Sequence, residues 1–368
     1  MNVALIIPSL SGGGAERVMV TYANGLQRAG HKVFIFTHTP YGAYSNEIHT
    51  KINVISIPYK NIISYIVDTR YLLQILRIQC LLSSMTHVNY FAILQGKLIA
   101  NNIQVIIRES NTVSEILKLN NSYKFRILDK IRRWVYTSAD MIIAPSEGVS
   151  LDLSENYHIA KLKISTIPNP VDYNYIQKLS KSTLEDKYVS KIEGKKIILG
   201  IGSLSKQKNF QDLIYAFKYV RSYSDAYLII LGDGPERSNL EILIRMLNLE
   251  SYVYMPGYVD NPFNYLKRSD VFVLSSIYEG LPNVLIHALL LGKKCISTDC
   301  PSGPSEILEN GKYGQLVQIN NRGELGKSMQ KMLNKNPPLN NVDHLIAKYS
   351  VDSVMQLLLK NKIFKYGL

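Results

Sequence analysis

The sequence has few cysteines and no segment that resembles a leader or a membrane span. Its three cysteines, Cys80, Cys295 and Cys300, are too few and too irregularly spaced for a disulfide framework or a zinc site, which favours a reducing compartment. The chain passes from Met1 directly into a strand-like run, without a basic leader or a cleavage site. The longest charge-free stretch, residues 78–96, contains too many polar side chains for a spanning helix. These absences predict an intracellular protein that does not cross a bilayer.

Acidic residues are scarce relative to basic ones. The chain has 42 lysines and arginines against 29 aspartates and glutamates, a formal net charge of +13. Such an excess implies anionic partners, which are nucleic acid, phosphate-bearing ligands or acidic lipid headgroups, and charge alone does not choose among them. A length of 368 residues, 46% of them hydrophobic, predicts two domains with a core each.

Short β-branched runs alternate with helical stretches in two successive groups. Strand–helix alternation predicts an α/β protein with two parallel sheets, each covered by helices on both faces. We expect an amphipathic helix at residues 15–28, closed by Gly30. The strands expected in the first group are 3–8, 33–37, 54–58, 105–108 and 141–144, and those in the second are 196–201, 227–231, 252–255, 271–274 and 295–298.

A change of composition separates the two groups. The segment Ile167-Pro168-Asn169-Pro170-Val171-Asp172 and the lysine-rich stretch 177–196 are typical of a domain exit followed by a linker. We therefore predict domains at 1–175 and 176–350. Ligands of open parallel sheets lie beyond the carboxyl ends of the strands, so two such sheets facing each other would form a cleft with both sets of loops pointing inward.

A glycine-rich loop, Ser11-Gly12-Gly13-Gly14, joins the first expected strand to the first helix. The amides and dipole of that helix would suit a phosphate group, and the glycines would let a ligand approach the backbone. The G-x-G-x-x-G spacing is absent, and the second strand ends without a ribose-binding carboxylate, which disfavours a nicotinamide cofactor. A plain loop is the alternative.

Two strand-end segments of the second domain combine polar groups that suit a nucleotide sugar. The loop at residues 202–209 contains Lys206 and Lys208, and lysine serves phosphate as a mobile point charge. The segment 275–287 places Glu279 at a strand tip, and its proline is expected to open a helix that carries Asn283 and His287 four residues apart on one face. A solvated basic turn and a solvated surface glutamate are the alternatives.

These motifs, in this order, resemble glycosyltransferase family four, the retaining enzymes of GT-B fold, over nearly the whole chain. The resemblance rests on the N-terminal glycine loop, the linker at 168–172, the 202–208 loop, Gly232-Asp233-Gly234, Pro256-Gly257-Tyr258-Val259, the 279–285 segment and 298–306. It implies two Rossmann-like domains facing across a cleft, the first binding the acceptor and the second the donor. We also expect the C-terminal segment 351–368 to pack back on the first domain.

The resemblance implies a role for each site residue. Glu279 would bind the hydroxyls of the transferred sugar and Lys208 the pyrophosphate, and these two are the expected catalytic residues. The expected donor-binding residues are Gly13, Gly14, Ser203, Lys208, Gly232, Gly257, Tyr258, Val259, Glu279, Gly280, Leu281, Pro282, Asn283, Val284, Leu285 and His287. The expected acceptor-binding residues are Gly12, Arg108 and Ser110. No metal and no cofactor are implied, and electrostatic stabilisation of the leaving nucleoside diphosphate replaces a covalent nucleophile.

The sequence departs from the family pattern at three positions. Ser203 stands where the family usually has arginine, His287 where it usually has glutamate, and no histidine stands near Ser110. Without the arginine, Lys208 lacks its usual cationic companion, and Arg17, Arg108 or Lys206 are the candidates to replace it.

Residues 123–134 combine an apolar stripe of Ile127, Ile131 and Trp134 with Arg126, Lys130 and Arg133. This composition is typical of a helix that lies in a membrane interface, and an ordinary helix packed on the first sheet is the alternative. No nucleic-acid motif accompanies it.

We therefore expect a cytoplasmic, peripheral membrane glycosyltransferase of a bacterium that uses a UDP-sugar and a lipid-linked saccharide in O-antigen, lipopolysaccharide or capsule assembly. Residues 303–306 hint at galactose or N-acetylgalactosamine. A non-catalytic nucleotide-sugar or glycan-binding subunit and a sugar-nucleotide epimerase are the other functions considered.

Overall fold

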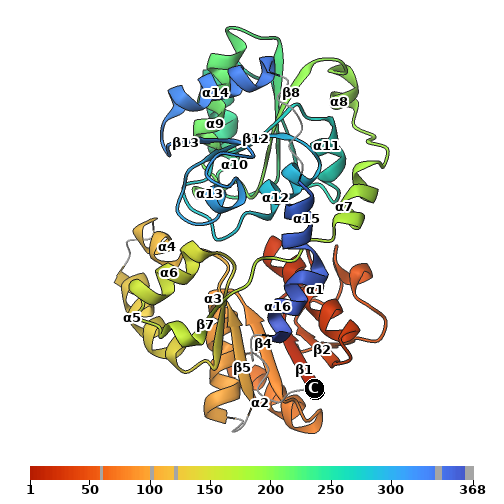
Figure 1. Ribbon diagram of the computed structural model, residues 1–368, viewed down its shortest axis with the longest axis vertical. Helices are drawn as coiled ribbons and strands as arrows, with labels where there is room; N and C mark the ends of the chain where they lie inside the picture. The colour runs from red at the N-terminus through yellow and green to blue at the C-terminus, as the bar shows by residue number, and fades with distance from the viewer. Residues whose placement is uncertain (59–60, 100–102, 120–122, 336–341, 361–368) are drawn as a thin grey trace. The chain divides into compact units, whose positions relative to one another are not determined.

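The computed structural model describes residues 1–58, 61–99, 103–119, 123–335 and 342–360 (Figure 1). The chain divides into two compact units, Met1–Val171 with Lys348–Leu368, and Asp172–Ala347. The first division falls four residues before the predicted boundary at 175, and the second three residues before the predicted return at 351. Each unit contains one parallel sheet, so the predicted pair of Rossmann-like α/β domains is confirmed.

Unit 1 is built on a seven-stranded parallel sheet of order β3-β2-β1-β4-β5-β6-β7. Its strands are β1 (Asn2–Ile6), β2 (Lys32–Thr37), β3 (Asn53–Ser56), β4 (Cys80–Ser84), β5 (Gln104–Arg108), β6 (Met141–Ala144) and β7 (Ile164–Thr166). Its helices are α1 (Gly14–Arg28), α2 (Ile62–Ile75), α3 (Thr86–Ile93), α4 (Val113–Leu119), α5 (Tyr123–Thr137), α6 (Glu147–Glu155) and α16 (Val351–Lys360), with 3-10 turns at Ser45–Glu47 and Lys161–Lys163 and a π-helix at Leu94–Ile99.

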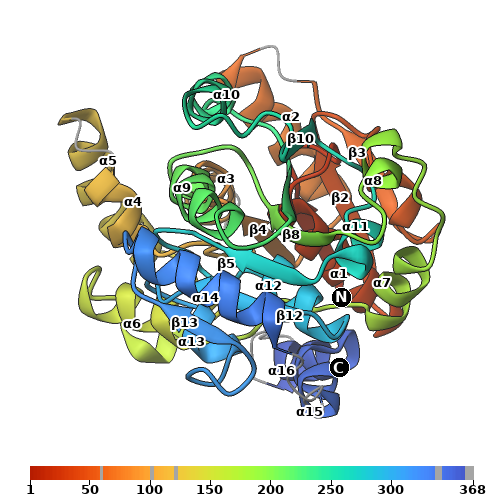
Figure 2. The same ribbon diagram turned by 90° about the horizontal axis from the view of Figure 1, so that it is seen from above.

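Two helix layers cover this sheet. Helix α1 inserts Val18, Met19, Tyr22 and Leu26 into the core on one face, and α16 packs beside it with Val354, Met355 and Leu358 (Figure 1). Residues 351–360 thus pack on unit 1, whereas residues 361–368 of the predicted segment lie outside the described part of the chain. Helices α2, α3, α5 and α6 contribute to the core on the opposite face, and α4 lies next to α5 (Figure 2).

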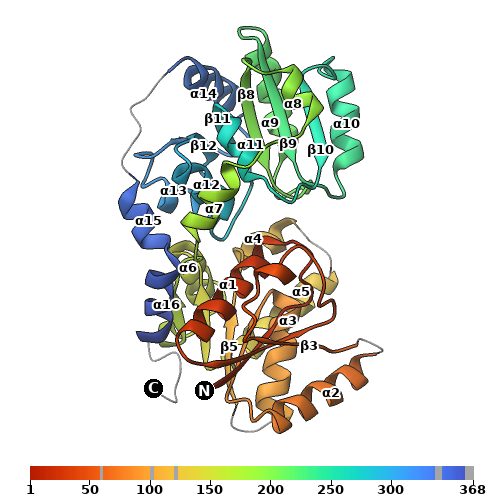
Figure 3. The same ribbon diagram turned by 90° about the vertical axis from the view of Figure 1, so that its right-hand side faces the viewer.

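Unit 2 is built on a six-stranded parallel sheet of order β10-β9-β8-β11-β12-β13 (Figure 3). Its strands are β8 (Lys196–Ile201), β9 (Ala226–Leu231), β10 (Val253–Gly257), β11 (Val271–Leu274), β12 (Lys294–Thr298) and β13 (Gln315–Val317). Its helices are α7 (Tyr173–Ser180), α8 (Lys187–Lys191), α9 (Phe210–Arg221), α10 (Arg237–Met246), α11 (Phe263–Arg268), α12 (Asn283–Leu290), α13 (Pro304–Ile307) and α14 (Arg322–Asn334), and α15 (Asp343–Tyr349) spans the second division.

The stretch 177–196, predicted to be a linker, is instead partly helical and belongs to unit 2. Asp172 caps α7 by accepting a hydrogen bond from the Tyr175 amide, and Asp186 caps α8 in the same way. Each helix buries a small apolar face, which includes Ile176 in α7 and Val189 in α8. The prediction failed because the exposed, lysine-rich faces of these short helices dominate the composition.

Candidate active site

The candidate site of unit 2 lies at the point where the strand order of its sheet reverses. Strands β8 and β11 are neighbours there, although β9 and β10 follow β8 in the chain. In open parallel sheets, loops that leave the carboxyl ends of two such strands diverge and leave room for a ligand. Lys208 follows β8 and Glu279 follows β11, so the fold brings the two predicted catalytic residues to the same place.

Lys208 and Glu279 form an ion pair. The Lys208 ammonium donates to Glu279 Oε1 at 2.6 Å, and the side chains are 16% and 5% exposed. The Ser276 hydroxyl donates to the same oxygen at 2.6 Å. The glutamate is therefore not the solvated surface residue of the alternative interpretation, because two donors hold its carboxylate in a nearly buried position.

Three further hydrogen bonds tie the two loops together, and a fourth joins the second loop to the segment after β12. The Gln207 side chain donates to the Tyr278 carbonyl oxygen at 3.0 Å, and the Ile277 amide donates to the Gln207 carbonyl oxygen at 2.8 Å. The Ser275 hydroxyl donates to the Lys208 carbonyl oxygen at 2.8 Å. On the other side, the Glu279 amide donates to the carbonyl oxygen of Pro301 at 3.2 Å. Backbone and side-chain contacts together thus fix the position of the ion pair.

Sequence reasoning missed Ser276, Gln207 and Thr298. The Thr298 hydroxyl donates to the Ser276 carbonyl oxygen at 2.6 Å and so supports the residue that holds Glu279. Nothing in the local sequence distinguishes these side chains from ordinary loop residues. Their partners lie 3 to 71 positions away, and only the fold shows them.

Helix α12 begins at Asn283, four residues after Glu279, so the predicted helix is present and starts one residue later than predicted. Pro282 is its N-cap residue and no side chain caps it. The first-turn residues Asn283 and Val284 are half-buried, whereas the Leu285 side chain is fully buried. Of the groups that we predicted to bind phosphate and ribose at this helix end, the backbone and the Asn283 side chain are suited to do so.

A tight turn after β12 supports the start of α12. Gly303 has φ +96°, and a Cβ atom there would lie 2.7 Å from Pro282 Cδ and 2.9 Å from the Gly280 carbonyl oxygen. Only glycine avoids both the backbone strain and the collision. The 298–306 motif, which carried part of the family resemblance, therefore has a visible structural use.

The glycines at the ends of β8, β9 and β10 pack against one another. A Cβ atom on Gly232 would lie 2.0 Å from the Gly202 carbonyl oxygen, and the Gly232 amide donates to the Gly257 carbonyl oxygen at 2.8 Å. Tyr258, which follows, is 53% exposed, and Val259 is half-buried. The predicted nucleoside-contacting backbone thus lies at the same sheet edge as Lys208 and Glu279.

His287 is largely buried. Its ring is 9% exposed and packs edge-on against the ring of Phe263 in α11, with 5.2 Å between the centroids. The helix still places it one turn after Asn283, on the predicted face. The ribose contact stays a prediction, and packing on α11 is the alternative.

We expect His287→Glu to tighten nucleotide binding by about 1.5 kcal/mol or more, because a carboxylate offers two acceptor oxygens to vicinal hydroxyls where a neutral imidazole offers one nitrogen. Calorimetric titration with UDP measures the change, and thermal unfolding controls for the cost of a charge at this buried position. Unchanged or weaker affinity in the folded variant would assign His287 to packing against Phe263.

The predicted residues of unit 1 have different environments. Gly14 is exposed and a Cβ atom there would meet no other atom within 4 Å, so the backbone is accessible. The carboxylate of Glu16, in contrast, occupies the space beside Gly13, with Oε2 1.9 Å from the position of an added Cβ atom. An acidic group therefore already stands at the N-terminus of α1, which weakens the prediction that this end receives a phosphate.

Arg108 is buried rather than open to an acceptor. The side chain is 2% exposed; its guanidinium donates to the Ser84 hydroxyl at 3.1 Å and to the Asn169 side chain. Burial, partly offset by the Tyr22 and Glu109 side chains, lowers the pKa of Arg108. The arginine ties the end of β4 to the segment that leaves unit 1, and its acceptor role stays a prediction.

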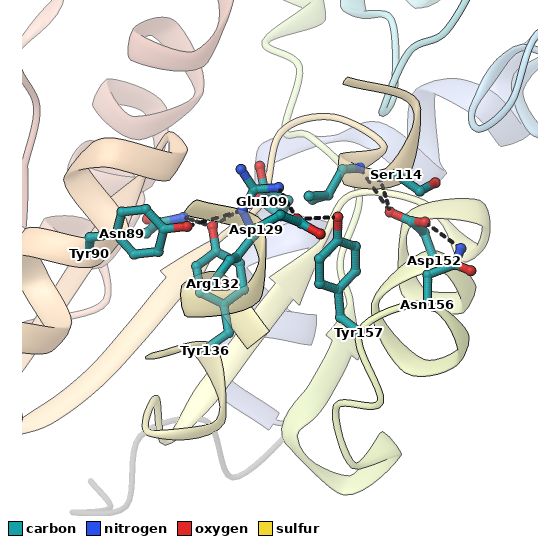
Figure 4. Close-up of polar contacts among 11 residues, drawn as sticks. Asn89, Tyr90, Glu109, Ser114, Asp129, Arg132, Tyr136, Asp152, Asn156 and Tyr157 are labelled. Atoms are coloured by element: carbon teal, nitrogen blue, oxygen red, sulfur yellow. Dashed lines mark hydrogen bonds and ion pairs between the residues drawn. The ribbon is translucent and has the colours of Figure 1, made fainter. Parts of the chain in front are cut away.

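A buried polar network surrounds Glu109 (Figure 4). Ser110 follows Glu109 in the chain and contacts its carboxylate. The Glu109 carboxylate accepts hydrogen bonds from the Tyr136 hydroxyl at 2.6 Å and from the Ser110 amide at 3.1 Å. Burial raises the pKa of this carboxyl, opposed by the Tyr136 hydrogen bond and the charge of Arg132. The network fixes the turn after β5, where the predicted acceptor-binding Ser110 is half-buried.

The companion cation that replaces the family arginine at Ser203 is not identified by these contacts. Ser203 is exposed and contacts the Ser205 hydroxyl at 3.2 Å. Arg17 pairs with Glu47 at 3.1 Å in unit 1, whereas Lys206 is exposed in the same loop as Lys208.

Among the residues described, no group of three His, Cys, Asp or Glu side chains is arranged to hold a metal ion.

Comparison with known proteins agrees with this geometry. The model of the family "Glycosyltransferase Family 4" matches residues 12–175, and that of "Glycosyl transferases group 1" matches residues 182–348. The chain is a glycosyltransferase that contains both of these family domains. The two matched segments correspond to the two units of the structure.

Two relatives and a solved structure define the neighbourhood of this transferase. A Campylobacter jejuni N-acetylgalactosamine-N,N'-diacetylbacillosaminyl-diphospho-undecaprenol 4-alpha-N-acetylgalactosaminyltransferase is 28% identical over 90% of each chain. An uncharacterized Methanocaldococcus jannaschii glycosyltransferase is 39% identical over 55% of this chain, and the match spans about half (52%) of that relative. Anabaena HepE, solved in complex with UDP-glucose, superposes with a TM-score of 0.81 at 17% identity over 98% of each chain, which shows the shared GT-B fold.

Proposed function

We propose that this glycosyltransferase moves a hexose or N-acetylhexosamine, with retention, from a UDP-sugar to a lipid-linked saccharide in bacterial surface polysaccharide biosynthesis. The observation that carries the proposal is the Lys208–Glu279 pair beside the N-terminus of α12. The Campylobacter relative, which matches over 90% of each chain and is named for a diphospho-undecaprenol acceptor, supports the acceptor class. O-antigen, lipopolysaccharide and capsule assembly are the processes that fit.

Each group at the site has a use in such a transfer. The Lys208 ammonium and the N-terminus of α12 stabilise the charge that develops on the departing UDP, and the Glu279 carboxylate accepts hydrogen bonds from sugar hydroxyls. The bond from the anomeric carbon to UDP breaks, and the acceptor hydroxyl bonds to that carbon from the face that UDP leaves and gives its proton to the departing diphosphate, so the anomeric configuration is retained. Positioning and electrostatics, rather than a covalent nucleophile, lower the barrier.

Release of UDP from a panel of UDP-sugars, with and without a lipid-linked acceptor, tests the proposal. We expect one donor to be consumed only when acceptor is present. Conversion of a donor without acceptor would favour an epimerase, and no consumption with any donor would favour a binding subunit. The panel includes UDP-galactose and UDP-N-acetylgalactosamine, which residues 303–306 favour.

We further propose that the enzyme works as a peripheral protein on the cytoplasmic face of the membrane, with α5 at the lipid surface. Ile131 and Trp134 are 45% and 68% exposed, whereas Arg132 and Tyr136 face the core (Figure 4). The Arg132 guanidinium donates to the Tyr90 hydroxyl at 3.2 Å and to Asp129 at 3.3 Å. Helix α5 thus keeps Arg132 and Tyr136 inside and leaves Ile131 and Trp134 exposed, an outer apolar surface that packing on the sheet does not require. No helix formed by the described residues is both long and apolar enough to cross a bilayer.

Neutralising Arg126, Lys130 and Arg133 should weaken binding to anionic vesicles. Each basic group near a charged bilayer contributes about 1 kcal/mol, so the triple change to glutamine should lower the partition coefficient on the order of 100-fold at low salt. Of these three side chains, Arg133 is exposed, and those of Arg126 and Lys130 lie outside the described part of the chain.

Vesicle co-sedimentation measures this binding. Changing the exposed lysines Lys187, Lys191 and Lys327 of unit 2 to glutamine removes the same charge elsewhere and is the matched control. Wild-type protein that ignores anionic vesicles at low salt would make α5 a structural helix.

A further inference from the structure

Helix α2 has two apolar faces, and the fold uses one of them. Tyr65 and Leu73 are 5% and 1% exposed and belong to the core of unit 1. Ile63, Val67, Tyr71 and Ile75 form a second stripe, and they are 71%, 58%, 62% and 59% exposed. A helix that is apolar on its inner and outer faces is not explained by packing on one sheet.

The second stripe is continuous. Its four residues are four positions apart, a spacing that places successive side chains above one another on one side of a helix. Together they expose on the order of 400 Å² of largely apolar surface, comparable to the largest patch on a typical monomer. We call these four residues the α2 stripe.

We propose that the α2 stripe inserts into the surface of a phospholipid bilayer. This inference rests on the proposed function, because it places the enzyme where a lipid-linked acceptor resides. With 14 residues, α2 is about 21 Å long and too short to cross a hydrocarbon core, so it lies in the plane of the interface. Tyr71 adds an aromatic ring with a polar tip, a residue type that is enriched at this depth.

The charges around the α2 stripe fit an anionic lipid surface. Arg70 and Arg77 are exposed on and just after the helix, and Asp68 is its one acidic residue. Arginine stems can lie along apolar surface while their head groups contact lipid phosphates. The overall charge of +13 has the same sign.

A second copy of the chain is a less suitable partner for the α2 stripe than a bilayer. A stable protein interface buries about 800 Å² on each partner, roughly twice what the α2 stripe exposes. Two copies would also repel one another, because each chain has a net charge of +13. A bilayer, in contrast, needs no matching shape.

The salt concentration separates the contribution of the α2 stripe to vesicle binding from the contribution of α5. Apolar insertion does not weaken as salt is added, whereas the basic residues of α5 are screened at about 1 M salt. We therefore expect wild-type protein to retain part of its vesicle binding at high salt, and the α2 stripe to account for that part.

The test is co-sedimentation with vesicles of phosphatidylethanolamine and phosphatidylglycerol at about 0.1 M and about 1 M NaCl. The variant Ile63→Gln, Val67→Gln, Tyr71→Gln, Ile75→Gln should bind at least about 10-fold more weakly at both salt concentrations. Ile242→Gln with Met246→Gln, which removes 47% and 73% exposed apolar side chains four residues apart on α10, is the matched control and should bind as wild type.

A fluorescence experiment covers the case in which the fourfold variant does not fold. In Tyr71→Trp, Trp134→Phe, the single tryptophan reports on the α2 stripe, because Trp134 is the one native tryptophan. We expect a blue shift on vesicle addition and quenching by brominated lipid.

Three results would overturn the proposal. They are unchanged vesicle binding by the folded fourfold variant, an unshifted and unquenched tryptophan at position 71, and a wild-type dimer that the variant converts to a monomer without a change in vesicle binding. Measuring UDP release with a detergent-solubilised acceptor distinguishes failure of the α2 docking proposal from failure of the proposed function. Turnover should persist there if only the docking inference is wrong, and should be absent with every donor if the proposed function is wrong.

Discussion

Glu279→Ala should lower sugar transfer by at least about 10³-fold, because it removes the carboxylate that we expect to bind the transferred sugar and to pair with Lys208. Glu279→Ala should also lower folding stability, because it removes the carboxylate that Lys208 and Ser276 contact at 2.6 Å. Loss of one partner from a nearly buried ion pair typically costs about 3–5 kcal/mol of folding stability. The burial of the glutamate therefore predicts a lower melting temperature as well as a loss of transfer.

Glu279→Gln separates the two effects. Its amide oxygen can still accept hydrogen bonds from Ser276 and Lys208, so it should melt closer to wild type while transfer remains low. Turnover and thermal unfolding are measured on both variants. Near-normal turnover in either one would remove Glu279 from the catalytic site.

Lys208→Ala should lower turnover about 10²- to 10³-fold, the usual effect of losing one preorganised charge that stabilises a leaving group. Donor affinity should fall as well, since the ammonium is expected to contact the pyrophosphate in the ground state and in the transition state. Steady-state kinetics over a range of UDP-sugar concentrations give both values.

Lys206→Ala is the matched control for this prediction. It removes the same charge from the same loop, but Lys206 is exposed and lies two residues from the lysine that contacts Glu279. A small loss of turnover in Lys206→Ala would assign the effect to Lys208, and a loss as large as that of Lys208→Ala would make Lys206 its cationic companion. A loss below threefold in Lys208→Ala would mean that other groups hold the phosphates.

Much of the fold was predictable because its strands are short apolar runs bounded by turn residues. All ten expected strands are present, and β4, β7 and β13 were missed. Strand β4 merges into the charge-free stretch 78–96 and continues into α3 without a glycine or proline at the junction. Strands β7 and β13 have three residues each, too few for a period to emerge.

The residues of the candidate site could be predicted from the sequence, but the contacts between them could not. Glycine, proline and charge patterns placed Lys208 and Glu279 at strand ends, but their ion pair depends on β8 and β11 being neighbours. The hydrogen bond from Thr298 to the Ser276 carbonyl oxygen and the contact of Arg108 with Ser84 join distant segments. The orientation of Arg132 on helix α5 could not be predicted either. It depends on Glu109 and Tyr90, which interact with the arginine on the inner side of the helix and are distant from it in the sequence.

Mass analysis of the lipid product tests the central claim most directly. The purified enzyme is incubated with the UDP-sugar selected by the donor panel and with a diphospho-undecaprenol-linked saccharide. We expect the lipid-linked saccharide to gain one hexose or N-acetylhexosamine unit, with one UDP released per unit added, and we expect the Glu279→Gln protein to form no such product. Consumption of the UDP-sugar with no increase in the mass of the acceptor would contradict the central claim.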